Sequence, residues 1–285
     1  MIGQSPIGLT WDHKNYSCTY DSLFTVLYYI WNEGQPKHGR YFENGMQLIQ
    51  ILQSEFTPLF NEKCTFESVG DHLRSILHNE KPLQYCYGTN YADINELVRD
   101  FTSMKSYGTS CLHCAHCRCS INKQCVYLRD YTVVRWSLSD KDDLQQTASV
   151  ERYLNYELIK NDEINICLIC HDLIKKDFPP YNTQYIDKLL SILIFALVSW
   201  IDINKYPEFN VSNLLKKYIL KGIIYLNCDH FTIKLVDENL IVWHHNGQVT
   251  QSICQKEQSL MNSDDIVPLK FYGQYKAIMV FHAEI

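Results

Sequence analysis

Two sequence patterns follow each other along the chain, and their order restricts its possible folds more than any other feature. In the first third, apolar residues recur at the 3.6-residue spacing of amphipathic helices. The sequence after Tyr107 is instead rich in the β-branched and aromatic residues that strands favour. Helices followed by strands, without alternation of the two, predict an α+β fold with antiparallel strands and exclude a doubly wound parallel sheet.

Four helices and seven strands are predicted from these patterns. The helices cover residues 19–31, 46–56, 66–77 and 92–101, the last with Asn90 or Asp93 near its cap. The strands cover residues 131–138, 163–168, 189–200, 218–225, 230–236, 241–245 and 277–282. Neither an internal repeat nor a low-complexity linker interrupts the 285 residues, so we predict a single domain over residues 1–285.

Charge and composition argue against several classes of protein. The net charge of −6 lacks the basic stripe expected of a nucleic-acid partner. The longest apolar run, residues 189–201, contains Ser191 and Ser199 and is too short to cross a bilayer, and the first residues lack the pattern of a signal peptide. Twelve cysteines without a secretory signal indicate a reducing compartment, cytoplasmic or nuclear, in which clustered thiols bind metal or catalyse reactions.

Two Cys-x-x-Cys pairs, Cys111/Cys114 and Cys167/Cys170, lie about fifty residues apart. Four thiolates at such spacing suit tetrahedral Zn²⁺, and a closed site of this kind serves folding and not catalysis. Further candidate ligands crowd the first pair and could replace one of its members or hold a second ion: His113, His116, Cys117, Cys119 and Cys125. The alternative is a set of redox-active or simply buried thiols.

Cys18 is the candidate nucleophile. It directly precedes the predicted helix over residues 19–31, whose first N–H groups and partial positive charge stabilise an anion. A catalytic cysteine needs such surroundings, because a thiol of ordinary pKa is mostly protonated at neutral pH. The alternative is an ordinary buried thiol at the start of a core helix. A histidine elsewhere in the chain that can pair with Cys18 would favour the catalytic interpretation.

His230 supplies that histidine at the start of the strand over residues 230–236. The following strand, residues 241–245, ends at Asn246. Antiparallel pairing of the two strands predicts that the side-chain carbonyl of Asn246 accepts the imidazole N–H and sets its tautomer and orientation. Asp229 is the alternative third member, although adjacent strand residues point to opposite faces.

His244 and His245 are interpreted as structural residues. They could form a metal site with His230, but no carboxylate or thiol has the spacing needed to complete it. Neighbouring residues of a strand also point away from each other, so the pair does not converge on one ion.

In this order, the motifs resemble those of the ubiquitin-specific proteases, the thumb–palm–fingers branch of the papain-like cysteine peptidases. The resemblance spans residues 9–282 and includes the paired Cys-x-x-Cys motifs. Its other segments are Asn15-Tyr-Ser-Cys18-Thr-Tyr-Asp21-Ser22, Tyr218-x-Leu220-x-Gly222, His230-Phe231, Trp243-His-His-Asn246-Gly247 and the strand over 277–282. Such variant motifs in a compact chain also look like the divergent ubiquitin-like protease modules of some fungal mobile elements.

The resemblance implies a helical thumb over residues 1–106, a zinc-binding fingers region over 107–180 and an antiparallel palm sheet over 181–285. It further implies a cysteine-type deubiquitinase that cleaves after the C-terminal Gly-Gly of ubiquitin, with Cys18 as nucleophile and His230 as general base. The expected partner of this monomer is ubiquitin or a relative such as SUMO or NEDD8. A catalytically weak ubiquitin-binding module is the alternative from another functional class.

Three departures from the family pattern concern the catalytic centre. Cys228 and Asp229 replace the Gly-Gly that precedes the family's histidine, and Asn15 lies one place earlier than the family's asparagine. His13 occupies the position, five before the cysteine, that often supplies an oxyanion donor. We therefore expect the oxyanion to be bound by the Cys18 N–H and Asn15, with His13 as the alternative donor.

Overall fold

The computed structural model describes residues 5–34, 47–102, 110–113, 120–124, 192–196, 208–211, 214–260, 269 and 271–285. Its helices are α1 (Cys18–Glu33), α3 (Gln47–Phe60), α4 (Phe66–Glu80) and α5 (Ile94–Thr102). Each predicted helix is therefore present, with ends shifted by a few residues. Asp93 explains the start of α5, because its carboxylate accepts the N–H groups of Asn95 (2.7 Å) and Glu96 (3.2 Å) as an N-cap.

Most of the described strands form one antiparallel sheet in the order β3-β10-β5-β6-β7-β8. Its strands are β3 (Ile192–Ala196), β5 (Leu214–Asn227), β6 (His230–Val236), β7 (Ile241–His245), β8 (Gln255–Ser259) and β10 (Tyr275–Glu284). Two short strands extend it: β4 (Glu208–Val211) pairs with β5, and β9 (Phe271–Tyr272) pairs with β10. A separate two-stranded sheet consists of β1 (Ser110–His113) and β2 (Ser120–Gln124).

The α+β prediction is confirmed, since helices precede an antiparallel sheet. The strands predicted at 218–225, 230–236, 241–245 and 277–282 are present, and the one predicted at 189–200 contains β3. The strands predicted at 131–138 and 163–168 lie outside the described residues, as do residues 125–180 of the predicted fingers region. Its division from the thumb and the palm therefore stays a prediction.

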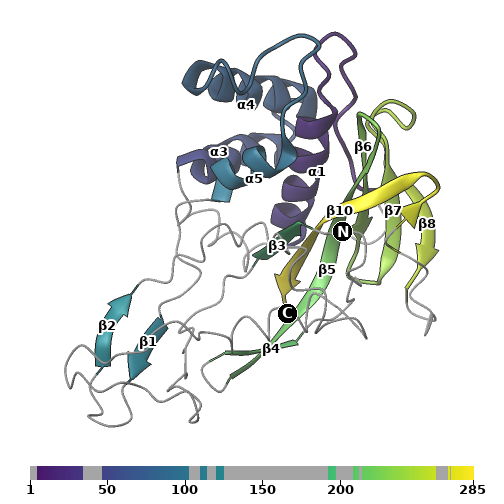
Figure 1. The fold of residues 1–285 in the computed structure, drawn as a ribbon. Coiled ribbons are helices and arrows are strands. Elements are labelled where there is room, and N and C mark those ends of the chain that lie inside the picture. The colour runs from purple at the N-terminus through teal and green to yellow at the C-terminus, as the bar shows by residue number, and fades with distance from the viewer. Residues whose placement is uncertain are drawn as a thin grey trace.

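Helix α1 forms the centre of the molecule. It runs between the other helices and the sheet (Figure 1), and nearly all of its residues are buried. It approaches the sheet closely at Gly222 of β5, where an added Cβ would lie 2.7 Å from a methyl carbon of Val26. Gly222 therefore lets the helix and the sheet pack at a distance that no larger residue allows.

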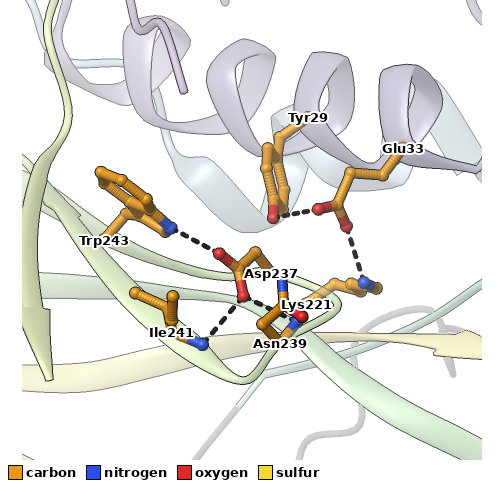
Figure 2. A network of polar contacts seen from close by, with 7 residues as sticks. All are labelled: Tyr29, Glu33, Lys221, Asp237, Asn239, Ile241 and Trp243. Atoms are coloured by element: carbon orange, nitrogen blue, oxygen red, sulfur yellow. Dashed lines mark hydrogen bonds and ion pairs between the residues drawn. The ribbon is translucent and has the colours of Figure 1, made fainter. Parts of the chain in front are cut away.

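A polar network joins the C-terminal half of α1 to the sheet (Figure 2). Tyr29 donates its hydroxyl to Glu33 (2.5 Å), and Glu33 pairs with Lys221 of β5 (2.6 Å). Nearby, Asp237 accepts the indole N–H of Trp243 (3.0 Å) and the backbone N–H groups of Asn239 and Ile241. Each charged group drawn in this network has a partner of opposite charge or a hydrogen-bond donor.

Among the described residues, no helix combines the length and apolar character needed to cross a membrane.

Candidate active site

Cys18 is the first residue of α1, whereas the sequence predicts a helix that begins directly after it. Ser17 precedes it in helical conformation and makes no side-chain cap, and the first backbone hydrogen bond of the helix joins Asp21 N–H to Ser17 O (2.9 Å). The N–H groups of residues 18–20 consequently have no acceptor within the helix. They form a cluster of donors next to the thiol.

The sulfur of Cys18 lies against the backbone on both sides of His230. It donates to the carbonyl oxygen of Asp229 (3.7 Å), and the N–H of Phe231 also faces it. Burial raises the pKa of the Cys18 thiol, and the N–H groups of Phe231 and Thr19 offset only part of this effect. The resting arrangement therefore disfavours the Cys18 thiolate relative to that of an ordinary cysteine.

His230 is oriented by Asn246, as the strand pairing predicts. Strands β6 and β7 are antiparallel neighbours, and His230 Nε2 lies 2.9 Å from Asn246 Oδ1. The same oxygen accepts the N–H of Gln248 (3.1 Å), which identifies it as the carbonyl oxygen and makes Nε2 the protonated nitrogen. The other ring nitrogen, Nδ1, then carries the lone pair that a general base needs.

The backbone around Asn246 is fixed by a tight turn. The hydroxyl of Thr250 accepts the Asn246 N–H (3.1 Å), and the Asn246 carbonyl accepts the N–H groups of Val249 (2.8 Å) and Thr250 (2.7 Å). Asn246 is also buried. Its side chain therefore presents a fixed acceptor to the imidazole.

Two aromatic rings flank His230 edge-on. The ring centroid of Trp11 lies 6.2 Å away and that of Tyr275 6.4 Å away. The backbone at Trp11 is held there because the Trp11 backbone N–H donates to Gly247 O (3.3 Å). A Cβ at Gly247 would come within 2.6 Å of Leu9 O and 2.8 Å of Trp11 N, so this contact requires glycine. Sequence reasoning missed Trp11, since nothing local links it to His230.

Asp229 meets Cys18 through its backbone. Asp229 is exposed, and within the described part of the chain its carboxylate makes no hydrogen bond to His230. The preceding residue, Cys228, has a φ of 51°, in the left-handed region that favours glycine. The backbone thus has a conformation suited to glycine although the sequence carries cysteine.

The loop over residues 12–17 holds both predicted oxyanion donors. Asn15 donates its side-chain amide to Asp12 (2.6 Å) and accepts the N–H of Gly88 (3.1 Å) with its Oδ1. His13 is exposed, with its ring centroid 6.2 Å from that of Trp11. One hydrogen of the Asn15 amide is therefore already committed to Asp12. The oxyanion roles of both residues stay predictions.

His244 and His245 have surroundings of their own. His245 shares a hydrogen bond with Gln251 O (2.9 Å), and burial lowers its pKa to about 4. Burial also lowers the pKa of His244, whose ring lies 4.4 Å from that of Tyr272. In the described part of the chain, no three His, Cys, Asp or Glu side chains gather as metal ligands. The structural roles of both histidines stay a prediction.

Of the four predicted zinc ligands, Cys111 lies in β1, whereas Cys114, Cys167 and Cys170 lie outside the described residues. The same is true of His116, Cys117, Cys119 and Cys125. The zinc site therefore stays a prediction.

No protein-family model and no curated protein matches the sequence. Solved structures do match the fold over almost the whole chain. A SAGA DUB module, Ubp8/Sgf11/Sus1/Sgf73 bound to monoubiquitin, matches with a TM-score of 0.55 and 13% identity, over 98% of this chain and 69% of that one. The same module bound to ubiquitin aldehyde matches with a TM-score of 0.54 and 12% identity, over 100% and 71%.

A third similar structure is the Pan2 pseudoubiquitin hydrolase–RNA exonuclease module of Saccharomyces cerevisiae in complex with RNA. It matches with a TM-score of 0.52 and 8% identity, over 99% of this chain and 54% of that one. At identities this low, the likeness concerns the fold alone. The chain has a deubiquitinase-like fold, which its solved relatives carry both as hydrolase and as pseudohydrolase modules.

Proposed function

We propose that this protein is a cysteine-type deubiquitinase with Cys18 as nucleophile, His230 as general base and Asn246 as the residue that orients His230. The hydrogen bond from His230 Nε2 to Asn246 Oδ1 is the observation that carries the proposal. It directs the proton to the Asn246 side of the ring and leaves Nδ1 as the acceptor, on a residue whose two chain neighbours both contact the Cys18 sulfur.

In the proposed reaction, His230 Nδ1 takes the proton of Cys18 as the sulfur attacks the carbonyl carbon of the C-terminal glycine of the substrate's Gly-Gly. The helix-terminal N–H of Cys18 and the Asn15 amide stabilise the oxyanion, with His13 as the alternative donor. The imidazolium then protonates the leaving lysine amine, and a water molecule, deprotonated by His230, hydrolyses the thioester. Each proton taken by His230 is returned in the following step.

The substrate is part of the proposal. Ubiquitin is the first candidate, because the matching SAGA module was solved with monoubiquitin and with ubiquitin aldehyde. SUMO and NEDD8 are the alternatives. Reaction with a panel of modifier probes, each carrying a thiol-reactive C-terminus, ranks the three. The protein is proposed to act as a monomer in the cytoplasm or nucleus.

Structural Zn²⁺ at Cys111, Cys114, Cys167 and Cys170 belongs to the same proposal. Four thiolates are a donor set that Zn²⁺ favours, and the ion would supply folding energy with no part in the chemistry. Metal analysis of the purified protein should give one zinc per chain, lost in the Cys167→Ser/Cys170→Ser variant. A metal-free protein with unchanged unfolding would contradict this assignment.

A catalytically weak ubiquitin-binding module is the second candidate. It is favoured by the Cys18 sulfur, whose pKa is raised by burial and whose proton is given to Asp229 O. The shared fold with the Pan2 pseudoubiquitin hydrolase points the same way.

A ubiquitin probe with a thiol-reactive C-terminus separates the two candidates. The proposed enzyme forms the adduct rapidly and at Cys18, and Cys18→Ala abolishes both the adduct and the cleavage of a fluorogenic ubiquitin substrate while retaining ubiquitin binding. Cleavage by the Cys18→Ala variant would disprove the assignment. Binding of ubiquitin by the wild type without adduct formation would establish the binding module instead.

A further inference from the structure

Arg74 is a buried cation close to the candidate active site. It lies on α4 with 5% of its surface exposed. In the part of the chain that the structure describes, no carboxylate lies within ion-pair distance of its guanidinium. Burying a charge is costly unless hydrogen bonds and nearby charges compensate for the lost water. The contacts that hold Arg74 therefore indicate what the residue is for.

Those contacts come from three segments that meet at Cys18. Arg74 Nη2 donates to the backbone carbonyl of Asn15 (3.0 Å), three residues before the candidate nucleophile. The guanidinium lies over the ring of Tyr20 in the first turn of α1 (4.7 Å to the centroid) and within 5.4 Å of the ring centroid of Tyr87. One side chain thus joins the loop before Cys18, the start of α1 and the segment before α5.

Asn15 is held from two directions by this arrangement. Its backbone oxygen accepts from Arg74, and its side-chain oxygen accepts the N–H of Gly88, the residue after Tyr87. Gly88 has a φ of 90°, a left-handed conformation available to glycine, which brings its N–H to the loop. The two anchors come from residues 59 and 73 positions away in sequence.

The loop over residues 12–17 needs such support. Tyr16 has a φ of 43°, which is unfavourable for a residue with a bulky side chain and persists only when its surroundings determine it. Arg74 holds the carbonyl of the peptide bond that immediately precedes Tyr16, and since that peptide is planar, its N–H is fixed as well. The bond from Arg74 therefore sets the direction in which the loop enters α1.

The charge of Arg74 also acts within the loop. Burial alone would raise the pKa of Asp12, but hydrogen bonds from Asn15 and Lys14, together with the charge of Arg74, lower it overall. Asp12 is thereby kept ionised as the acceptor for the Asn15 amide (2.6 Å) and the Lys14 N–H (2.9 Å). Arg74 stabilises the loop through its charge as well as through its direct hydrogen bond.

We propose that Arg74 is a positioning residue that holds the 12–17 loop in the conformation in which Cys18 and the oxyanion donors meet the substrate. The inference rests on the proposed function, because it assigns Arg74 to the same catalytic centre. Arg74 acts through Asn15 and Tyr16 and does not itself touch the reacting atoms.

The test compares Arg74→Lys, Arg74→Gln and Arg74→Met with the wild type. Arg74→Met should lower kcat on a fluorogenic ubiquitin substrate about 10- to 100-fold, the loss typical of small misplacements in an active site. KM and the affinity for ubiquitin should change by less than about twofold, because binding away from the scissile bond is untouched. Arg74→Lys keeps the charge but not the planar stacking, so its kcat should lie between those of the wild type and Arg74→Met.

Two further measurements separate positioning from general stability. Alkylation of Cys18 by iodoacetamide should stay within about twofold in Arg74→Met, since this reaction uses the thiolate but no oxyanion donor. Hydrogen exchange at the amides of residues 13–18 should quicken by about tenfold or more in that variant, while exchange within α3 stays unchanged. The exchange measurement requires no enzymatic activity.

Lys221→Met is the matched control. Lys221 is another buried cation, 8% exposed, but it pairs with Glu33 at the other end of α1. This variant should lose stability yet keep kcat. If Arg74→Met keeps the wild-type kcat and exchange pattern, or if both variants lose kcat in proportion to folded protein, the positioning role is overturned. Faster exchange at 13–18 in Arg74→Met, together with a wild type that forms no ubiquitin adduct, would support the role of Arg74 and reject the proposed function separately.

Discussion

Helix α1 meets the rest of the molecule differently at its two ends. At the C-terminal end, Glu33 pairs with Lys221 and accepts the Tyr29 hydroxyl (Figure 2). Nearby, the carboxylate of Asp237 accepts three N–H groups. At the N-terminal end, the helix lacks a side-chain cap, and Cys18 holds its proton toward a backbone carbonyl.

The C-terminal end of α1 contributes to stability, whereas the N-terminal end forms the candidate site of the reaction. Paired charges at the C-terminal end hold the helix against the sheet, and any change there should appear as lost stability. Uncapped N–H groups, and a thiol that contacts the backbone on both sides of the oriented His230, form a site that can stabilise a new negative charge. Such a site is costly in the resting protein, which explains why Arg74, Asp12 and Gly88 brace its loop.

The largest expected effect is at the N-terminal end. His230→Ala should reduce turnover of a ubiquitin substrate by about 10²- to 10⁴-fold, because it removes the general base. The free energy of unfolding should change little, since the ring is only partly buried. Steady-state kinetics beside urea unfolding gives both quantities. Unchanged turnover would show that His230 is not the base.

The C-terminal end should show the reverse pattern. Asp237→Ala should lower the free energy of unfolding by about 2–4 kcal/mol, because it leaves the N–H groups of Asn239, Ile241 and Trp243 without their acceptor. Its kcat should stay near that of the wild type at temperatures where both are folded. A fall in kcat larger than the fall in folded fraction would erase the contrast between the two ends.

Gly247→Ala should affect both stability and turnover. The new Cβ would lie 2.6 Å from Leu9 O, so the segment that carries Trp11 must shift, at a cost of about 1–3 kcal/mol. Since Trp11 flanks His230, kcat should fall as well. Gly273→Ala is a control for the glycine change, because nothing lies within 4 Å of an added Cβ there, although its φ of 58° adds backbone strain. An unaltered kcat in Gly247→Ala would show that Trp11 placement is irrelevant to the reaction.

Asp21 allows a test by pH. Burial raises its pKa well above the ordinary value, and the Ser17 hydrogen bond and the charge of Arg74 offset only part of this. The folded protein thus binds the proton more tightly than the unfolded chain. The contribution of Asp21 to the free energy of unfolding is fully present below the pKa of Asp21 in the unfolded chain, about 3.9. It is lost as the pH rises through the pKa of Asp21 in the folded protein.

Asp21→Asn should accordingly stabilise the protein by about 1–2 kcal/mol at neutral pH, because a neutral amide avoids the cost of protonating or burying the carboxylate on folding. The decline in stability with rising pH should flatten over that window. Urea unfolding from pH 4 to 8 measures both effects. A wild-type stability that rises across the window would mean that Asp21 is ionised and well paired in the fold.

The smallest expected effect concerns the turn before His230. Cys228→Gly should raise the free energy of unfolding by about 0.5–1 kcal/mol, since the relief of left-handed strain at a φ of 51° exceeds the entropy that glycine gains in the unfolded chain. Thermal unfolding measures it, with Cys64→Gly as a control within the described residues that lacks a positive φ. Destabilisation by Cys228→Gly would show that its side chain matters more than its backbone.

The sequence predicted the elements whose signals are local. Apolar spacing predicted α1 and α4, and β-branched and aromatic content predicted β6 and β7 with their observed bounds. The pairing of those two neighbouring strands was enough to anticipate the contact between His230 and Asn246, only 16 residues apart. Strand β8 was missed because Gln255–Ser259 is polar throughout and joins the sheet edge through its backbone.

By itself, the sequence therefore determined the α+β class, the position of Cys18 at the N-terminus of α1 and the partnership of His230 with Asn246, because each depends on neighbouring residues and their hydrogen bonds. Only the tertiary structure brought Arg74 and Gly88 to Asn15, Trp11 to His230 and Lys221 to Glu33. These contacts join segments 59 to 219 residues apart, and such contacts are set by how whole elements pack. No local pattern in the sequence encodes that packing.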